Sequence, residues 1–239
     1  MPGRSIDRRR MLCWCCAGTA LGFTSVRAGA AASDAVPAAQ EARHHVIFAD
    51  EALRVMRVLI PPGDYTRWHT HTHDFVITVL KGSSTRSEEA GESRAVLGEM
   101  VTNTVLFAPY AQKALTHQVH NTSTWLNHQL AFEILTPGPG RYGAADRGAE
   151  PAYRMVFDNP RVRAWRLKLE PGAVAAPVVQ NGPGLRVILA GERVIDTGTN
   201  GSVLETDIRA GDAAMLAPDT RSVANGGGAP LDMIEYELR

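Results

Sequence analysis

The chain repeats one sequence unit twice, so its fold must accommodate two similar structures. Residues 47–82 align with residues 156–191 without a gap, at an offset of 109 positions. Gly63, which follows a proline at a turn, has its counterpart at Gly172, which also follows a proline. Turn residues keep their place in this way when the turn itself is kept. We therefore expect two homologous domains.

The repeat also sets the expected domain boundaries. Further along the chain the offset falls to 104 positions, and Asn121 then matches Asn225. We expect one domain at residues 44–137 and the other at residues 153–239. The segment between them, residues 138–152, is rich in glycine and proline and is predicted to be a linker.

Each unit has the sequence pattern of β-strands. Short apolar and β-branched runs, such as residues 54–60 and 163–169, end at turns that contain proline or glycine. Neither unit shows a sustained helical period. The Glu-rich stretch at residues 86–94 is predicted to be a solvated hairpin. Short strands with evenly spaced turns predict an all-β sandwich, barrel or jelly roll.

The first 30 residues differ from the rest and have the layout of an export signal. A basic start is followed by the uncharged residues 11–26 and then by the small residues 28–30. This order is typical of a signal peptide. The pair Arg8-Arg9 before the apolar stretch resembles the twin-arginine motif. We expect residues 1–30 to be removed and residues 31–43 to form an N-terminal tail.

Removal of this segment would change the composition of the chain. All three cysteines lie within it, so the mature chain would form no disulfide and offer no thiolate. It would carry 20 basic and 24 acidic residues, which argues against nucleic acid as a partner. No run of 18 or more apolar residues occurs, so no stable membrane anchor is expected after processing. The mature protein is expected to be periplasmic or secreted.

All eight histidines lie in the first unit or at its entrance. His69, His71 and His73 alternate along one predicted strand and so share one face. Two imidazoles two residues apart can reach one metal ion, and His117 on a later strand can supply a third ligand. His69, His71 and His117 are therefore the predicted metal ligands. A hydrogen-bonded polar core without metal is the alternative.

The spacing around these histidines resembles the first motif of the cupin superfamily. That motif runs Gly, five residues, His-x-His, three or four residues, Glu, six residues, Gly. Gly63, His69 and His71 fit the first half of the spacing. Gly82 fits its end, but Phe75 stands at the position of the glutamate. The resemblance implies two tandem jelly-roll barrels, also called double-stranded β-helices, as in the two-domain bicupins.

The second cupin motif is kept in part. It contains a proline, then a histidine, and then an asparagine four residues after the histidine. Pro109, His117 and Asn121 follow this order, with three extra residues between the first two. The resemblance implies that His117 completes the metal-binding set begun by the His-x-His pair.

The second unit keeps the turns of the repeat but not the predicted ligands. Val178, Gln180 and Arg221 occupy the positions of the three histidines. Gly184 stands at the position of Phe75. A unit with these side chains is not expected to bind a catalytic metal, so its predicted role is to pack against the first unit. A ligand pocket that uses Gln180 and Arg221 is the alternative.

Three residues next to the predicted ligands are further candidates. His73 shares the predicted face of His69 and is an alternative ligand or a polar pocket group. Asp74 should point to the opposite face unless a bulge reorients it. Phe75 should make the pocket more apolar. The remaining histidines are predicted to be strand, terminal or surface residues: His44, His45, His120 and His128.

Three neutral imidazoles predict the binding of one divalent transition metal, and the ligand type does not distinguish Fe, Mn, Zn, Ni and Cu. Open positions at such a site suit an oxidoreductase of the dioxygenase type acting on a small organic molecule. One alternative is a binding or sensory module without turnover. Another is a metal-dependent hydrolase, isomerase or lyase. A homodimer is also compatible with the sequence.

Overall fold

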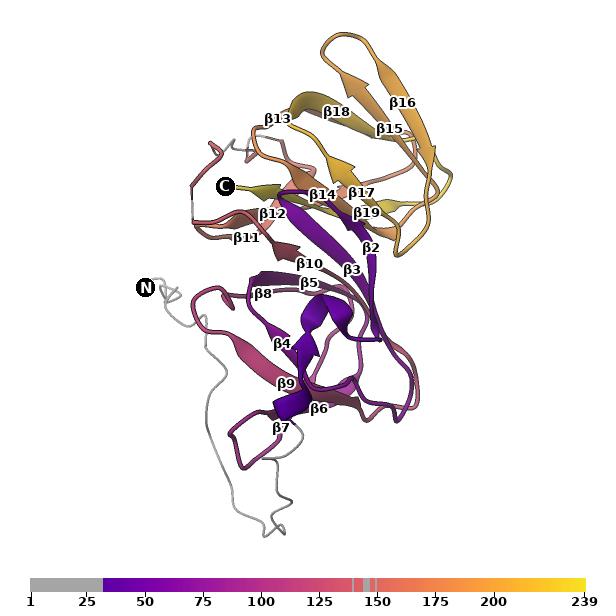
Figure 1. Cartoon of the computed structure of the whole chain (residues 1–239). Coiled ribbons are helices and arrows are strands. Elements are labelled where there is room, and N and C mark those ends of the chain that lie inside the picture. Colours follow the sequence, from indigo (N-terminus) through magenta and orange to yellow (C-terminus); the bar gives the residue numbers. More distant parts are fainter. Residues whose placement is uncertain (1–31, 139, 144–146, 149) are drawn as a thin grey trace, which may run out of the picture.

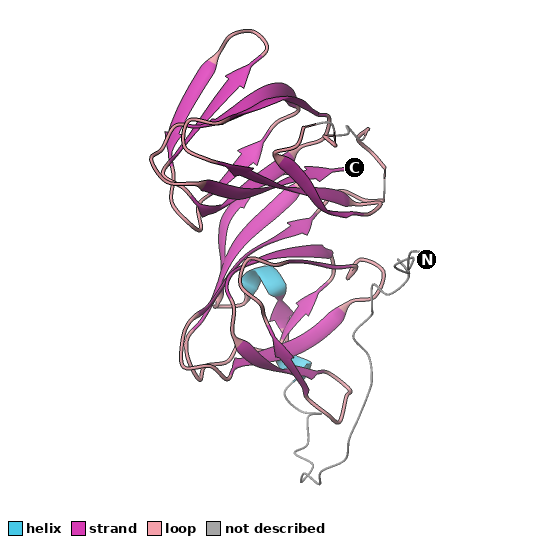
Figure 2. Cartoon of the chain, turned by 180° about the vertical axis from the view of Figure 1, so that it is seen from behind, coloured by secondary structure: helices cyan, strands magenta, loops and turns pink. Residues whose placement is uncertain are grey.

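The computed structural model describes residues 32–138, 140–143, 147–148 and 150–239. These residues form two β-barrels stacked one on the other, as the two opposite views show (Figures 1 and 2). The expected signal peptide, residues 1–30, lies outside the described residues. Within the described ranges, no helix has the length and apolar character needed to cross a membrane.

The first barrel begins with two short 3-10 helices and is otherwise made of strands (Figure 1). Its elements are η1 (Ala32–Asp34), β1 (Val36–Pro37), η2 (Ala38–Gln40), β2 (His44–Ala49), β3 (Leu53–Ile60), β4 (His69–His71), β5 (Asp74–Lys81), β6 (Ser84–Glu89), β7 (Val96–Glu99), β8 (Val105–Ala108), β9 (Leu115–Asn121) and β10 (Asn127–Ile134).

The second barrel, drawn from salmon pink through orange to yellow in Figure 1, contains strands and no helix among its described residues. They are β11 (Tyr153–Asp158), β12 (Val162–Leu169), β13 (Val174–Gln180), β14 (Gly184–Ala190), β15 (Arg193–Gly198), β16 (Val203–Asp207), β17 (Ala213–Leu216), β18 (Asp219–Asn225) and β19 (Leu231–Leu238).

Apart from β1, which has no counterpart among the described strands of the second barrel, the two barrels have the same topology. One sheet of the first barrel has the order β2-β3-β10-β5-β8, and its counterpart in the second is β11-β12-β19-β14-β17. The other sheets have the orders β1-β4-β9-β6-β7 and β13-β18-β15-β16. Chain segments alternate between the two sheets of a barrel, as in a jelly roll. The expected all-β fold with two tandem jelly-roll barrels is thereby confirmed.

The repeat seen in the sequence reappears in the strand register. His69 lies opposite His117 in the β4–β9 pair, and Val178 lies opposite Arg221 in the β13–β18 pair. The turn glycine Gly63 has φ 70°, and its counterpart Gly172 has φ 74°. Residues with a side chain rarely adopt this left-handed backbone conformation, so glycine is kept at the turn in both units.

The expected N-terminal tail and linker both contribute to the barrels. Within residues 31–43, β1 pairs in parallel with β4, with Val36 opposite His69. This pairing satisfies backbone groups that the edge of β4 would otherwise leave open. Within residues 138–152, Arg147 is buried in the second barrel, where it forms an ion pair with Glu235.

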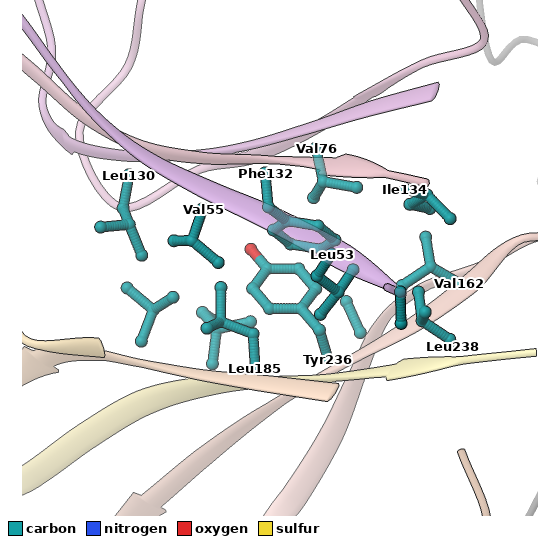
Figure 3. Packing of buried hydrophobic residues seen from close by; sticks show 14 of the residues in the cluster. Leu53, Val55, Val76, Leu130, Phe132, Ile134, Val162, Leu185, Tyr236 and Leu238 are labelled. Carbon is teal, nitrogen blue, oxygen red and sulfur yellow. The ribbon is translucent and has the colours of Figure 1, made fainter. Parts of the chain in front are cut away.

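A shared hydrophobic core joins the barrels (Figure 3). Phe132 of β10 lies among residues of both barrels and packs against Tyr236 of β19, with ring centres 5.0 Å apart at 71°. An edge-to-face aromatic pair of this kind contributes about 0.5–1.5 kcal/mol beyond its buried area. The hydroxyl groups of Tyr236 and Thr78 share a hydrogen bond of 2.6 Å across the interface. The two barrels therefore form one packed unit.

Candidate metal centre

The three histidines predicted as metal ligands come together inside the first barrel. β4 places His69 and His71 on its inner face, and β9 places His117 directly opposite His69. Their candidate ligand atoms all lie within 4.8 Å of one another. His69 and His71 are buried, and His117 is mostly buried. The site is therefore built from two adjacent strands of the sheet that contains β4 and β9.

Hydrogen bonds orient two of these rings. The Nδ1–H of His69 donates to the carbonyl oxygen of Arg67 over 2.8 Å, which leaves the lone pair on Nε2. The Nδ1 atom of His117 lies 3.3 Å from the hydroxyl of Ser87. Histidines that bind metal commonly use their second nitrogen in this way.

The third ring is placed by its neighbours rather than by an outer hydrogen bond. The Nε2 atoms of His71 and His117 face each other at 3.2 Å. Within the described part of the chain, the buried Nδ1 of His71 has no hydrogen-bond partner. A buried polar atom without a partner is uncommon and is a feature of functional sites. The arrangement gathers nitrogen atoms where a cation could bind them.

Burial keeps these rings uncharged. It lowers the pKa of His69, His71 and His117 below the ordinary value for histidine, and neighbouring histidines lower the pKa of the last two further. Neutral imidazole is the form that binds a metal ion. The residues present therefore fit a divalent transition metal, which imidazole nitrogen binds well.

The surroundings of the cluster are apolar and aromatic. The ring of Phe75 lies edge-on to His71 with ring centres 4.6 Å apart, and Tyr110 lies 5.0 Å from His71. Burial, with a smaller effect from Glu89, raises the pKa of Tyr110 to about 12. Phe75 thus packs directly against one of the three histidines. No carboxylate belongs to the three-residue cluster within the ranges that the structure describes.

His73 and Asp74 are not brought into the cluster. The expected alternation would place His73 beside His71, but β4 ends at His71 and the chain turns before β5. The side chain of His73 is 40% exposed. Asp74 accepts hydrogen bonds from Arg161 at 2.6 Å and from the backbone of Ala111. Asp74 therefore connects the two barrels instead of binding in the pocket.

Two residues of the site were not predicted from the sequence as functional. His44, expected to be a strand or terminal residue, is buried with its ring centre 4.7 Å from that of His69. Burial, with a further effect of His69, lowers the pKa of His44 to about 3. Tyr110 is the second such residue. Its only sequence signal is its place after Pro109 in the second motif.

The other histidines lie outside the cluster. His45 is exposed on β2. His120, which has the opposite strand parity to His117, stacks on Tyr65 with ring centres 4.0 Å apart. His128 is partly buried near Arg57, which together with burial lowers its pKa. These positions agree with the strand or surface roles expected for these three residues.

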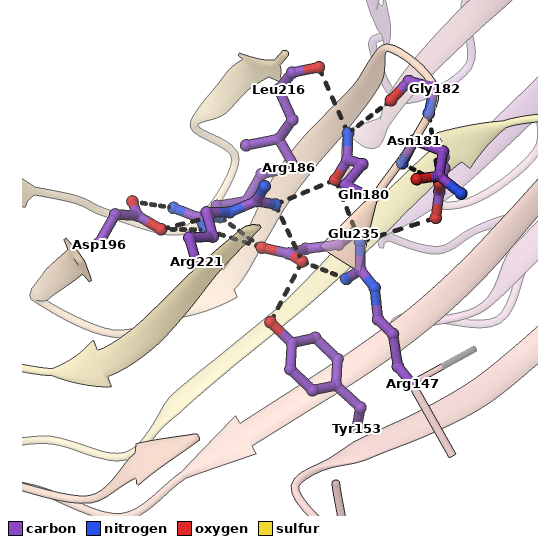
Figure 4. Close-up of polar contacts among 11 residues, drawn as sticks. Arg147, Tyr153, Gln180, Asn181, Gly182, Arg186, Asp196, Leu216, Arg221 and Glu235 are labelled. Carbon is purple, nitrogen blue, oxygen red and sulfur yellow. Dashed lines mark hydrogen bonds and ion pairs between the residues drawn. The ribbon is translucent and has the colours of Figure 1, made fainter. Parts of the chain in front are cut away.

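The centre of the second barrel contains charged residues in place of the histidines (Figure 4). Arg221 donates to the side-chain oxygen of Gln180 over 3.0 Å, and Arg147 donates to the same atom over 3.1 Å. Arg186 forms hydrogen bonds with the Glu235 carboxylate of 2.7 and 3.0 Å. Buried charges of this kind must be paired, and here they fill the space with ion pairs.

The arginines also determine the charge state of Glu235. Burial alone would raise its pKa, but Arg186, Arg221 and Arg147 around it hold the pKa well below its usual range. Glu235 is therefore ionised at neutral pH. Cationic guanidinium groups are unsuited to metal binding, so within the described residues the candidate ligands lie only in the first barrel.

A cavity of about 440 Å³ opens beside this charged cluster. Ile47 and Arg57 of the first barrel line one side of it, and Arg186 and Asp196 of the second barrel line another. The rest of the lining comes mostly from β14, β15, β16 and β17, and it includes the polar side chains of Thr206, Asp207 and Asp212. Its size is within the range of small-molecule pockets.

Comparisons with known proteins identify the fold. No family model and no curated protein matches the sequence. Among solved structures, AerE from Microcystis aeruginosa is 10% identical, with a TM-score of 0.59 over 83% of this chain and 98% of AerE. The 11S globulin from Wrightia tinctoria, which has an auxin binding site, is 10% identical, with a TM-score of 0.60 over 79% of this chain and 76% of the globulin.

A metalloenzyme is also among the similar structures. Oxalate decarboxylase from Bacillus subtilis is 13% identical, with a TM-score of 0.57 over 78% of this chain and 68% of the enzyme. That enzyme contains Mn(II) centres. At such low identity these similarities concern the fold alone. With the three-histidine cluster, they show that the chain has the fold of the cupin superfamily in its two-barrel form.

Proposed function

We propose that the protein is a metal-dependent oxidoreductase of the oxygenase type that acts on a small organic molecule. The observation that carries the proposal is the cluster of His69, His71 and His117, whose ligand atoms lie within 4.8 Å of one another. These three residues would hold one divalent transition metal. Such an ion supplies open coordination positions at which a substrate and O₂ can bind.

The residues around the cluster suit this chemistry. Phe75 and Tyr110 pack against His71 and limit the access of water to the site. Tyr110 remains protonated at neutral pH because its pKa is raised to about 12. It can donate a hydrogen bond to an oxygen atom of the substrate but cannot act as a general base. The aromatic contacts of His71 exclude bulk water, so they favour an oxygenase over a hydrolase, which needs a water molecule as its nucleophile.

The proposal is tested by metal analysis and then by asking whether the bound metal has open coordination positions. Purified protein from residue 31 onward should bind about one Fe(II) per chain under anaerobic conditions. Nitric oxide, which binds Fe(II) in place of O₂ and forms a stable complex, should then give the EPR signal of a high-spin iron nitrosyl. A His71→Gln variant, which carries the residue of the second barrel, should give neither result. A wild-type protein that binds no Fe(II), Mn(II), Zn(II), Ni(II) or Cu(II) would overturn the proposal.

A second candidate function is ligand binding without turnover. The cavity of about 440 Å³ beside the second barrel's charged cluster favours it, because this cavity lies apart from the histidines. Thermal-shift screening of small organic molecules against wild-type and His71→Gln protein separates the two functions. Ligands that stabilise both proteins equally, with no O₂ consumption by the Fe(II)-loaded wild type, would favour the binding module.

We also propose that the protein is exported and acts in the periplasm or outside the cell. The proposal is supported by the basic, apolar and small-residue order of residues 1–30. The absence of cysteine after residue 30 is compatible with that location.

A further inference from the structure

We propose that His44 is a fourth ligand of the metal ion, so that the site binds through four imidazoles and no carboxylate. This inference rests on the proposed function, because it concerns the same site. His44 lies outside the His-x-His pair and enters the site from β2, a strand of the opposite sheet. Three observations of the structure carry the inference.

The first observation is the distance between the rings. The ring centre of His44 lies 4.7 Å from that of His69 and 6.0 Å from that of His71. Metal–nitrogen distances are about 2.0–2.1 Å, so two imidazoles on one ion have ring centres up to roughly 6.5 Å apart. Both distances fall within this limit. The position of His44 is thus compatible with an ion shared with His69 and His71.

The second observation is the hydrogen bond that orients the ring. The Nδ1 of His44 lies 2.8 Å from the carbonyl oxygen of Ala38. A carbonyl only accepts, so Nδ1 carries the proton and Nε2 keeps its lone pair. His69 has the same arrangement with the carbonyl of Arg67. This pairing of a ring N–H with a backbone carbonyl is typical of histidines that bind metal.

The third observation comes from the repeat. Position 44 corresponds to Tyr153, because His44 lies opposite Val58 and Tyr153 lies opposite Leu167, at the same offset of 109. The hydroxyl of Tyr153 donates to Glu235 over 3.3 Å at the centre of the second barrel (Figure 4). The strand position shared by His44 and Tyr153 therefore directs the side chain to the centre of the barrel in both units. In the first barrel, that centre holds the three histidines.

A four-imidazole site has a chemical consequence. The carboxylate expected from the cupin motif is missing at Phe75, and His44 would replace it with a neutral donor. The ion would keep its full positive charge. We infer that such a site prefers metals that bind nitrogen strongly, with Cu(II) above the other divalent ions of the series, and binds an anionic substrate group more readily than a three-histidine, one-carboxylate site does.

Cu(II) binding to the mature full-length chain tests the inference. Pulsed EPR that counts coordinated imidazoles should find four in the wild type and three in His44→Ala. The affinity for Cu(II), measured by competition with a chelator, should fall by more than about 100-fold, because loss of an outer partner alone costs about 10- to 100-fold. His45→Ala, the exposed neighbour on the same strand, should match the wild type in both measurements.

A second variant separates the loss of a ligand from the loss of the fold. His44→Tyr copies Tyr153 and keeps an aromatic side chain at the position. Circular dichroism should match the wild type, while the imidazole count falls to three. An unchanged count in folded His44→Ala and His44→Tyr overturns the inference and leaves the proposed function standing. A wild-type protein that binds no metal overturns both.

Discussion

The Nε2 atoms of His71 and His117 lie 3.2 Å apart, although 46 residues separate the two in the sequence. β4 and β9 are neighbours in one sheet, so the pairing of these strands creates the contact. Both rings are buried and their pKa values are lowered, so neither carries a charge that would repel the other at neutral pH. A cation that accepts both lone pairs would stabilise this arrangement.

The ranking of the histidines can be tested by substitution. His71→Ala and His117→Ala should each abolish metal binding, and His69→Ala should nearly do so, because each change removes one of the three imidazoles whose ligand atoms lie within 4.8 Å of one another. Elemental analysis after dialysis measures the result. His120→Ala is the matched control on β9, and its metal affinity should stay within about threefold of the wild type because an outer partner would cost about 10-fold or more.

His73→Ala distinguishes this ligand set from the alternative in which His73 is a ligand. The side chain of His73 is 40% exposed and lies 4.0 Å from the Glu133 carboxylate, so its removal should leave the metal content unchanged. If His73→Ala instead emptied the site while His69→Ala kept it, the ligand pair on this segment would be His71 and His73.

The stability of the metal-free protein should depend on pH in a defined direction. Free histidines of the unfolded chain take up protons near pH 6.5, whereas folded His71 and His117 do so only at lower pH. The unfolded state then binds more protons, so the free energy of unfolding should fall as the pH drops below about 6.5. Urea unfolding at several pH values measures the slope.

Two variants assign this slope to the buried rings. His71→Gln should make the pH dependence of the free energy of unfolding shallower, because one histidine with a lowered pKa has been removed. His45→Gln replaces an exposed histidine on β2 and should leave the slope unchanged. Equal slopes in both variants and the wild type would show that the buried histidines do not determine the pH dependence.

The shared core predicts that both barrels unfold together. Phe132→Ala should lower the free energy of unfolding by about 3–5 kcal/mol, as truncation of a buried Phe usually does, without separating the transitions of the barrels. The fluorescence of Trp68 follows the unfolding of the first barrel, and that of Trp165 follows the second. Each is measured in a variant whose other tryptophans are replaced by Phe. Leu97→Ala, at an exposed position, should change stability by less than about 0.5 kcal/mol.

The charged cluster of the second barrel should be sensitive to the loss of one charge. Glu235→Gln should cost about 3–5 kcal/mol, because the buried arginines would lose a counter-charge. Calorimetric or urea unfolding measures this cost. Glu205→Gln removes a carboxylate 4.0 Å from Arg193 at an exposed position, and it should change stability by less than about 0.5 kcal/mol. A small effect of both changes would contradict the prediction.

The export route can be tested in the precursor. Changing Arg8 and Arg9 to Lys should retain the precursor in the cytoplasm if the twin-arginine route is used. Cell fractionation followed by immunoblotting measures the distribution of precursor and mature forms. Unchanged export that depends on the Sec machinery would reject the twin-arginine route but keep the signal peptide.

Much of the fold could be read from short-range patterns. The run at residues 54–60 corresponds to β3 (Leu53–Ile60), and the run at residues 163–169 corresponds to β12 (Val162–Leu169). The offsets of 109 and 104 also placed Arg221 at the position of His117, and in the structure Arg221 lies opposite Val178 as His117 lies opposite His69. These predictions succeed because strand alternation and turn residues depend on neighbouring positions in the chain.

The same short-range logic failed at His73. The alternation of His69, His71 and His73 assumes one continuous strand, but β4 has three residues and ends before His73. Whether a strand continues or turns depends on the partners available to its backbone, and β4 finds them in β1 and β9. No local pattern in the sequence contains that information.

The sequence by itself determined the two-unit β organisation and the confinement of histidine to the first unit. Only the tertiary structure decided that His44 lies beside His69 and that both barrels share one core. It also decided that Arg147, within the expected linker, is buried in the second barrel and pairs with Glu235. The physical reason is that strand pairing and core packing join segments far apart in the chain. Their proximity depends on the combined burial of many side chains and not on any single segment.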